Sequence, residues 1–514
     1  MRAAPRIPTT WLAAGFVAAV LLRLATLGSY PLIDPTEGRY AEIPREMVAT
    51  GDWIVPHLAP DEPFWAKPPL SFWATALAYA AFGISEVTAR LGSVLFAAAT
   101  LLCTALAALR LLGPGTALPA LAVLGTTGLF YVLAGSVLPE PALCAAVTLS
   151  ATSLALATRG EAPGRRGPWR WLFFVGLGLG AMAKGAVAVV LPMAMAGVWA
   201  ALQPQARAAL RRLPWIRGSL LAALLTVPWH LAAEARSPGF LEYYLWGEHV
   251  QRFLVPDWHG LYGHSHDHPP GTIWLYWVLG TLPWLPAVLW ATPRAAWRAA
   301  WSDPWRCYLW IWILVPPAFF TLARNISIPY VLVSLPPFAL WTVSALGWTR
   351  AAMTEEPRQL GLLPTALLLG LVPAIWLVVS IAILPGVGER RSQRTLVRAV
   401  ERLSVSPDFR IVYLGRMPGS APFYARGAAV EVRDPSSPRL AELLTDGRPD
   451  FVALRSDDVQ SAPPRLLERT QEVGRYGRYD LRAEPGSLRP DRGRGSQGAT
   501  RLPAPRARSR SRSE

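Results

Sequence analysis

The chain has 514 residues, 52% of them hydrophobic, and a formal net charge of +16. In a soluble protein this excess of positive charge would point to nucleic acid. Here most arginines lie between long apolar stretches or in the C-terminal tail, so membrane topology explains them and no nucleic-acid partner is expected. The three cysteines, Cys103, Cys144 and Cys307, fall inside apolar stretches and predict no disulfide framework.

The first apolar segment covers residues 10–29 and follows the basic start MRAAPR. This layout is that of a signal peptide, but a clean small-residue cleavage site is lacking and more apolar segments follow. We therefore expect an uncleaved first helix that leads to the outer face of the membrane.

Further apolar segments of about 20 residues, enough to cross hydrocarbon, predict a polytopic α-helical membrane protein. Four arginine-rich loops, 159–170, 205–217, 294–306 and 349–358, orient the spans because basic loops stay in the cytoplasm. All four face the cytoplasm if 68–83, with only about 14 apolar residues, is an interfacial or re-entrant helix. After residues 10–29, the predicted spans are 88–111, 115–134, 142–158, 171–183, 186–202, 218–233, 273–293, 307–323, 328–348 and 361–385.

The C-terminal part has a different character from the rest of the chain. Residues 389–485 contain the β-rich runs RIVYLG, AVEVRD and DFVALR between the helical patterns QRTLVRAVERL and PRLAELL. This alternation predicts a small soluble α/β domain on the external side. Residues 486–514, rich in Arg, Ser, Pro and Gly, are expected to form a disordered basic tail. The membrane domain would cover 1–385, with about 11–13 helices and a large external loop over 30–87.

Charged residues follow the first apolar segment directly, in the stretch IDPTEGRYAE at 33–42. Charges in hydrocarbon cost several kcal/mol, so such a cluster lies at a surface or performs a function. Asp34 and Glu37 are the candidate catalytic acids, and Arg39 and Tyr40 beside them are additional candidates. Ordinary solvation of a surface loop is the alternative interpretation.

Lysine is rare in this chain, since only Lys67 and Lys184 occur among the 50 Lys plus Arg residues. Arginine evidently serves wherever a generic positive charge suffices. The two lysines therefore indicate places that need a compact ammonium group on a flexible stem. Glu140 and Glu248 are further candidates on the same predicted face, and snorkelling anchors are the alternative for the lysines.

Histidines gather in one predicted external loop, because five of the seven lie between His249 and His268, including HSHDH at 264–268. Alternating histidines in an extended segment can bind a metal. A polar loop with chance histidines is the alternative.

A series of motifs occurs in a fixed order: PLIDPTEGRYAEIPREMVATGDWIVP, AKPPL, FGISEVTARLGS, VLPEPAL, AMAKGAVAVVLP, VPWHLAAEARSPGFLEYYLWGEHVQRF, LPWLP and FFTLARNISIPYVLVSLPP. In this order they resemble the bacterial aminoarabinose transferases and, more broadly, the protein O-mannosyltransferase-like glycosyltransferases of the GT-C fold. The resemblance covers residues 10–385, and that family also has a soluble external C-terminal domain.

The resemblance implies transfer of a sugar from a polyprenyl-phosphate donor on the outer face of the bacterial inner membrane. The acceptor would be a lipid A-like glycolipid, another glycan or a protein. Lys67 and Arg324 match positions that contact the donor phosphate, and Asp34 and Glu37 fall in the acidic motif used for catalysis. Glu140 matches a second acidic position.

The chain also departs from the family pattern. The usual proline-aspartate-glutamate is Pro35-Thr36-Glu37 here, with an acid at Asp34, which leaves open which carboxylate is the base. His249 matches a histidine that helps to hold a structural zinc, but the partner glutamate is Ala66 here. We therefore expect no required cofactor, and a structural divalent metal would need other ligands than the family pair.

The chemistry of such a transfer fits these residue types. A phosphate leaving group needs positive charge where negative charge develops, and an acceptor hydroxyl needs a base within hydrogen-bond reach. A transporter or flippase of lipid-linked sugars is the alternative, and it would place its polar groups near the bilayer midplane. A catalytically inactive scaffold that displays the external domain is a second alternative.

Overall fold

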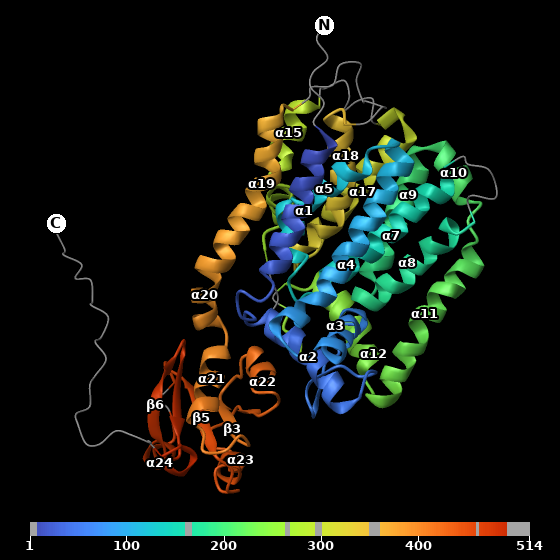
Figure 1. The fold of residues 1–514 in the computed structure, drawn as a ribbon. Coiled ribbons are helices and arrows are strands. Elements are labelled where there is room, and N and C mark those ends of the chain that lie inside the picture. The colour runs from blue at the N-terminus through green and yellow to red at the C-terminus, as the bar shows by residue number, and fades with distance from the viewer. Residues whose placement is uncertain are drawn as a thin grey trace, which may run out of the picture. The chain divides into compact units, whose positions relative to one another are not determined.

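The computed structural model describes residues 8–159, 167–256, 258–262, 268–292, 301–348, 360–458 and 462–490. The predicted tail from residue 491 onward, residues 264–267 of HSHDH and much of the basic loops at 159–170, 294–306 and 349–358 lie outside these residues. The chain divides into two compact units (Figure 1). Unit 1 comprises Met1–Thr395 and Met417–Gly427, and unit 2 comprises Leu396–Arg416 and Ala428–Glu514.

Unit 1 is built from helices, with one short antiparallel hairpin of β1 (His57–Ala59) and β2 (Glu62–Pro63). Its first helices are α1 (Thr9–Ala25), α2 (Thr36–Thr50), α3 (Leu70–Phe82), α4 (Glu86–Ala107), η1 (Ala108–Leu112), α5 (Ala117–Gly125), α6 (Gly128–Leu133), α7 (Glu140–Thr158), α8 (Trp169–Lys184), α9 (Val187–Leu202), α10 (Pro204–Leu210) and α11 (Trp215–Arg236). They are followed by α12 (Phe240–Glu242), η3 (Tyr243–Gln251), α13 (Arg252–Leu254), α14 (Thr272–Gly280), α15 (Trp284–Ala291), α17 (Pro304–Thr321), η4 (Ile328–Ser334), α18 (Leu335–Ala345), α19 (Leu362–Val378), η5 (Val379–Ile383), α20 (Leu384–Arg391) and α22 (Ser420–Tyr424).

Five helical segments of the described residues are long and apolar enough to cross a membrane: Glu86–Leu112, Glu140–Thr158, Trp215–Arg236, Ile328–Ala345 and Leu362–Arg391. The pair α14 and α15 counts as a sixth when taken together. Helices α1, α3 and α9 are apolar but shorter. The chain is thus a multi-pass membrane protein, with fewer uninterrupted long helices than the eleven predicted spans, because several of those spans are short or broken.

Two predicted spans are not continuous helices. The segment predicted at 273–293 bends by 91° between α14 and α15, and the segment predicted at 115–134 is interrupted between α5 and α6. The two breaks meet, since Gly128 N–H donates to the carbonyl of Leu282 at 2.7 Å and Trp284 Nε1 donates to Thr126 Oγ1 at 3.0 Å. Backbone groups freed inside a membrane protein need such partners, so the two interruptions depend on each other.

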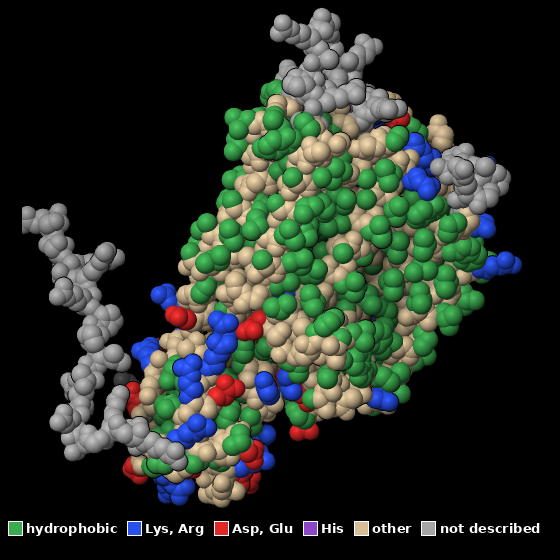
Figure 2. All heavy atoms as spheres, viewed as in Figure 1, with side chains coloured by type: hydrophobic (Ala, Val, Ile, Leu, Met, Phe, Trp, Pro, Cys, Tyr) green, Lys and Arg blue, Asp and Glu red, His purple; other side chains and the backbone are tan. Residues whose placement is uncertain are grey.

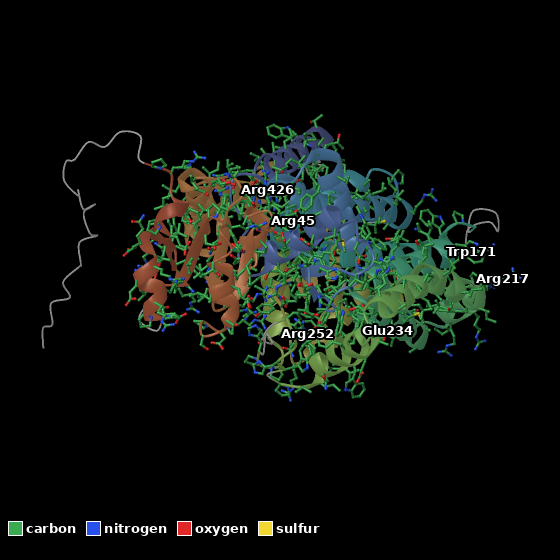
Figure 3. The ribbon with its side chains drawn as sticks, turned by 90° about the horizontal axis from the view of Figure 1, so that it is seen from below. Arg45, Trp171, Arg217, Glu234, Arg252 and Arg426 are labelled. Carbon is green, nitrogen blue, oxygen red and sulfur yellow. The ribbon has the colours of Figure 1, made fainter. Side chains whose placement is uncertain are left out.

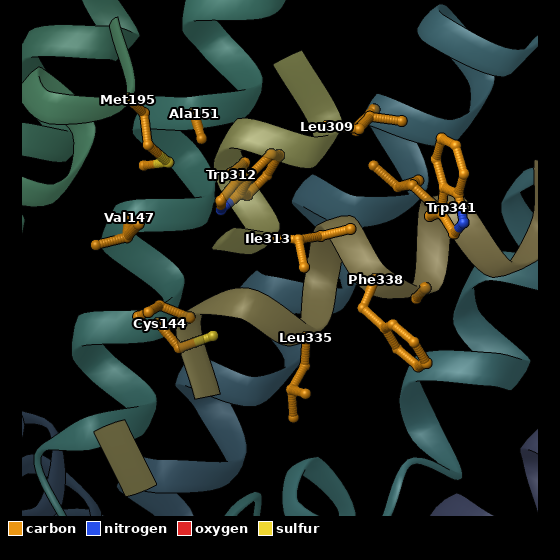
Figure 4. Close-up of a cluster of buried hydrophobic side chains, with 14 of the residues drawn as sticks. Cys144, Val147, Ala151, Met195, Leu309, Trp312, Ile313, Leu335, Phe338 and Trp341 are labelled. Carbon is orange, nitrogen blue, oxygen red and sulfur yellow. The ribbon is translucent and has the colours of Figure 1, made fainter. Parts of the chain in front are cut away.

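The core of unit 1 lies where α7, α9, α17 and α18 meet (Figure 4). Val147 and Met195 lie there with Trp312 and Trp341, all nearly inaccessible to solvent. The outer surface is equally apolar, because leucines of α4 and α11 are each more than half exposed: Leu95, Leu102, Leu220, Leu224 and Leu231. Figure 2 shows hydrophobic side chains over this face, as expected of helices that face lipid.

Helix α2 carries most of the charged first-loop stretch. It begins after Pro35, has Glu37 in its first turn, where the helix dipole favours an acid, and ends at Gly51 in the left-handed conformation (φ 74°). Its middle is buried despite its charge, because Arg45 bonds Glu42 through two nitrogens at 2.7 Å each and also contacts Glu46. The ion pairs therefore make a polar helix compatible with the interior of unit 1.

Unit 2 contains a five-stranded sheet in the order β4-β3-β5-β7-β6. Strand β3 (Arg410–Leu414) pairs in parallel with β4 (Ala429–Val432) and β5 (Asp450–Arg455), and β7 (Tyr479–Ala483) pairs antiparallel with β5 and β6 (Gln471–Tyr476). The remaining elements are α21 (Arg394–Leu403), which starts at the end of unit 1, α23 (Pro438–Leu443), α24 (Pro464–Arg469) and η7 (Pro485–Ser487). The predicted small α/β region is thereby confirmed as part of the fold.

Close helix contacts in unit 1 depend on glycine. A Cβ placed on Gly176 of α8 would clash with Ser150 Oγ of α7 and would lie 2.9 Å from the backbone nitrogen of Ser150. We predict that Gly176→Ala lowers the free energy of unfolding by about 1–3 kcal/mol, because the backbone of α7 cannot yield as a side chain would. Thermal unfolding of the detergent-purified protein measures this.

Gly197→Ala in α9 is the matched control, since a Cβ there meets no atom of the described residues within 4 Å. Alanine also has the higher helix propensity, so this variant should be as stable as the wild type or more so. Equal thermal midpoints for both variants would contradict the proposed close contact.

Candidate active site

The first ion-pair cluster joins the AKPPL motif to the segment after α12. Lys67 Nζ donates to Glu248 Oε2 at 2.9 Å, and Arg252 Nη1 donates to the same oxygen at 3.0 Å. Tyr243 completes the set by donating its hydroxyl to Glu248 Oε1 at 3.2 Å. The side chains of Lys67 and Glu248 are only 12% and 3% exposed, so one buried carboxylate serves two cations.

The electrostatics of this cluster favour excess positive charge. Burial lowers the pKa of Lys67, an effect that Glu248 opposes. Burial alone would raise the pKa of Glu248, but Lys67 and Arg252 hold it below its ordinary value. The ionised form of Glu248 is therefore favoured, with two basic side chains on one carboxylate.

The second ion pair joins the other lysine to the LPEP motif. Lys184 Nζ donates to Glu140 Oε1 at 2.6 Å and lies 3.9 Å from the ring centroid of Tyr330. Glu140 starts α7, where the helix dipole stabilises an acid. Its second oxygen, Oε2, is buried and has no hydrogen-bond partner within the described residues. A buried carboxylate oxygen without a partner is costly, so its position suggests an interaction with a bound ligand.

Tyr40 of α2 lies within electrostatic range of both ion pairs. Burial raises the pKa of its hydroxyl, and among the charged groups that act on it Glu140 has the largest effect, with Arg252 and Glu248 also contributing. Lys184 in turn acts electrostatically on Lys67. The structure thus brings together these predicted site residues: Tyr40, Lys67, Glu140, Lys184 and Glu248.

His249 packs against the turn that follows the second lysine. Its Nδ1 lies 2.7 Å from the carbonyl of Tyr244, and its Nε2 accepts the N–H of Ala186 at 3.1 Å. Gly185 has φ 76°, and a Cβ there would clash with the imidazole. Both ring nitrogens of His249 thus lie on backbone groups, and a metal role for His249 remains a prediction. No group of three or more metal-ligating side chains occurs in the described part of the chain.

The two first-loop acids have their oxygens engaged. Glu37 accepts from Arg90 at 2.8 and 3.2 Å and from the N–H groups of Val137 and Ile33. Asp34 accepts from the N–H of Ser420 at 2.6 Å and from its hydroxyl at 2.5 Å. Burial raises the pKa of Asp34 to about 6, although the Ser420 bonds and Arg39 oppose this. The role of either acid as base remains a prediction.

Arg39 and Arg324 lie at the edge of this arrangement. Arg39 Nη1 donates to the carbonyl of Tyr262 at 2.7 Å. Arg324 has an exposed side chain, and its backbone N–H donates to the carbonyl of Phe253 at 3.0 Å. The neighbouring Asn325 donates to the carbonyl of Arg252 at 2.6 Å. The Arg324 segment therefore supports the helix turn that carries Arg252.

Sequence reasoning missed Arg252 and Tyr330. Arg252 is one arginine among many in an arginine-rich chain, and only its place three residues after His249 in the quoted motif could have singled it out. Tyr330 lies in the last quoted motif, but nothing in the sequence indicates that its ring contacts Lys184.

Known proteins resemble this chain in sequence. Residues 10–244 match the profile of the dolichyl-phosphate-mannose-protein mannosyltransferase family. The undecaprenyl phosphate-alpha-4-amino-4-deoxy-L-arabinose arabinosyl transferase of Pectobacterium carotovorum is 33% identical over 63% of this chain and 57% of its own length. The corresponding protein of Edwardsiella ictaluri is 31% identical over 72% of this chain and 66% of its own length. The alignments thus span little more than half of the first of these relatives.

Solved structures extend the likeness to nearly the whole chain. The crystal structure of ArnT from Cupriavidus metallidurans bound to undecaprenyl phosphate superposes with a TM-score of 0.75, at 19% identity, over 93% of this chain and 98% of ArnT. The apo structure of the same protein gives the same TM-score. This chain has the GT-C fold of ArnT and is similar in sequence to the aminoarabinose transferases. The family resemblance predicted from the first-loop and lysine motifs is therefore confirmed.

In this ArnT-like chain, Glu248 should be essential to stability. We predict that Glu248→Gln lowers the free energy of unfolding by about 3–5 kcal/mol, because Lys67 loses its buried counter-charge. Asp52→Asn is the matched control. Asp52 pairs with Arg236, whose side chain is 55% exposed, and an exposed pair contributes about 0–1 kcal/mol.

The pH dependence of stability provides a second readout for Glu248. Its folded-state pKa lies below the ordinary value of 4.5, so its contribution is complete above that value and is lost as the pH falls through the folded-state pKa. Thermal unfolding of wild type and Glu248→Gln should therefore converge in acid. Parallel curves down to low pH would contradict the ion-pair interpretation.

Proposed function

We propose that this chain transfers a sugar from a polyprenyl-phosphate donor to an acceptor, on the outer face of the bacterial inner membrane. The observation that carries the proposal is the meeting of Lys67, Lys184 and Arg252 around two carboxylates, Glu140 and Glu248. Three cations against two anions leave one positive charge for an anionic ligand. The relatives support this reading, because their names specify an undecaprenyl-phosphate donor and the superposed ArnT structure holds undecaprenyl phosphate.

The donor phosphate would bind at Lys67 and Arg252. Both cations donate to Glu248 Oε2. If one of them turns to a phosphate, the other still pairs with Glu248, so no charged group is left without a partner. The exposed leucines of α4 and α11 give the polyprenyl tail an apolar surface within the membrane. Nothing in these contacts selects aminoarabinose, so the sugar is left as a general class.

The transfer itself is a substitution at the anomeric carbon. The acceptor oxygen forms a bond to that carbon, the bond from the carbon to the phosphate oxygen breaks, and polyprenyl phosphate leaves with the electron pair. Lys67 and Arg252 stabilise the charge that grows on the leaving oxygen. An acceptor hydroxyl must also lose its proton to a base at hydrogen-bond distance.

Glu140 is the best-placed base in this arrangement. Its Oε1 is bound by Lys184, which fixes the carboxylate, and its Oε2 is buried without a partner among the described residues. Asp34 and Glu37 would need to release their existing hydrogen bonds before acting as base. We therefore assign proton abstraction to Glu140 and the shaping of the first loop to the two other acids.

The phosphate assignment predicts a clear loss of transfer. Lys67→Ala and Arg252→Ala should each lower kcat/KM by about 100-fold or more, because each removes a charge that stabilises the leaving group. A purified-enzyme assay with radiolabelled polyprenyl-phosphate sugars measures the rate. Arg217→Ala is the control, since Arg217 is exposed at the start of α11 and well apart from Arg252 (Figure 3). Wild-type transfer in both variants would refute the assignment.

The base assignment makes a separate prediction. Glu140→Gln should lower kcat by about 100- to 10,000-fold for a hydroxyl acceptor and leave binding of polyprenyl phosphate largely intact. Glu389→Gln, on the exposed surface of α20, is the matched control. If Glu140→Gln transfers normally while Asp34→Asn or Glu37→Gln does not, the base is a first-loop acid.

A further inference from the structure

One part of unit 1 comes from far along the chain. The segment Met417–Gly427, which contains α22, belongs to unit 1 although β3 and β4 of unit 2 precede and follow it in sequence. This α22 segment packs against the start of α2. Figure 3 labels Arg426 beside Arg45 of α2, and a Cβ on Gly427 would lie 3.4 Å from Arg45 Nη2.

Ser420 makes the central contact of the α22 segment. It is fully buried and donates both its N–H and its hydroxyl to Asp34, at 2.6 and 2.5 Å. Its hydroxyl oxygen also accepts the N–H of Gln393 at 3.0 Å. Two donors from one residue hold both oxygens of a carboxylate, which fixes its orientation as well as its position.

The backbones meet closely enough to require glycine on both sides. A Cβ on Gly38 of α2 would clash with the backbone nitrogen of Ser420, and a Cβ on Gly419 would lie 3.0 Å from the backbone nitrogen of Arg39. Any displacement of the α22 segment therefore acts directly on the first turn of α2. Tyr40 lies in the turn that follows, within electrostatic range of both ion pairs of the candidate site.

Tyr424 makes a second attachment at the other end of α22. Its hydroxyl accepts the N–H of Leu32 at 2.8 Å and donates to Glu86 at 3.3 Å. Glu86 is held in turn by Arg394 at 3.2 Å. The backbone on both sides of Asp34 and Pro35 is thus bound to the α22 segment or packed against it.

We propose that the α22 segment is a positioning element of the active site, in which Ser420 fixes Asp34 and thereby the first turn of α2 with Tyr40. The proposal rests on the proposed transferase function. It gives Asp34 a role different from that of a base, because Asp34 acts through the backbone that it anchors. Ser420 is accordingly a positioning residue.

Protonation of Asp34 should weaken this attachment. A neutral carboxyl group accepts hydrogen bonds less strongly than a carboxylate. Arg39 is the charged group that acts on Asp34 electrostatically, whereas Glu86 and Arg394 on the neighbouring elements pair with each other. The hydrogen bonds from Ser420 lower the pKa of Asp34, so their loss should raise it further above its present value of about 6.

The test is a double-mutant cycle of Ser420→Ala, Asp34→Asn and the double variant in the full-length protein, with transfer measured between about pH 5.5 and 8.5. Each single variant should lower kcat about tenfold at neutral pH, with little change in KM for the donor, and the double variant should be no worse. The acid limb of the Ser420→Ala profile should move to higher pH. Ser436→Ala is the control, because Ser436 makes the same pair of bonds to Asp434 on the exposed surface of unit 2.

Two outcomes would overturn the proposal. In the first, the loss of kcat in the double variant equals the sum, in free energy, of the losses in Ser420→Ala and Asp34→Asn. In the second, Asp34→Asn abolishes transfer while Ser420→Ala is normal at every pH. The wild type and Lys67→Ala, run in the same assay, test the proposed function separately. If the wild type transfers no sugar, thermal unfolding of the same four proteins still measures the coupling between Ser420 and Asp34.

Discussion

The arrangement of the site depends on two buried carboxylates, Glu140 and Glu248, which pair with three cationic side chains. An isolated ion inside a protein is destabilising by several kcal/mol, so Lys67 and Arg252 can lie close together only because Glu248 lies between them. Glu140 does the same for Lys184. Under the proposed function, the two carboxylates stabilise the buried cations, and the one cation in excess would attract an anionic ligand. A fully compensated set would be more stable and would have no reason to bind phosphate.

Much of this site could be predicted from residue usage. The two lysines stand out in a chain that otherwise uses arginine, and both are part of the ion-pair cluster. The β-rich runs at 410–414, 429–432 and 450–455 could be predicted because they are rich in β-branched and aromatic residues and alternate with helical patterns. The hairpin of β6 and β7 could not be predicted, since its outer strand is exposed and lacks an apolar face.

The remaining features depend on contacts between residues distant in sequence. The bend at Leu282 and the break at Thr126 are joined by hydrogen bonds. Each segment is continuously apolar in sequence, so neither one indicates by itself that its helix is interrupted. Ser420 lies 386 residues after Asp34, in a stretch that by pattern belongs to the α/β region. Arg252 differs from the other arginines in sequence only by its place in the motif that contains His249. Periodicity and composition describe local preference, and these interactions are set by tertiary packing.

The place of α22 in the chain also has a consequence for biosynthesis. A ribosome adds about 5–20 residues each second, so the first loop emerges roughly 20–80 seconds before Ser420 exists to bond with Asp34. During that time the membrane helices are added one after another, and Asp34 lacks its partner from the α22 segment. A chain terminated after Thr395 would lack Met417–Gly427, so no single cut directly after the last membrane helix leaves unit 1 whole.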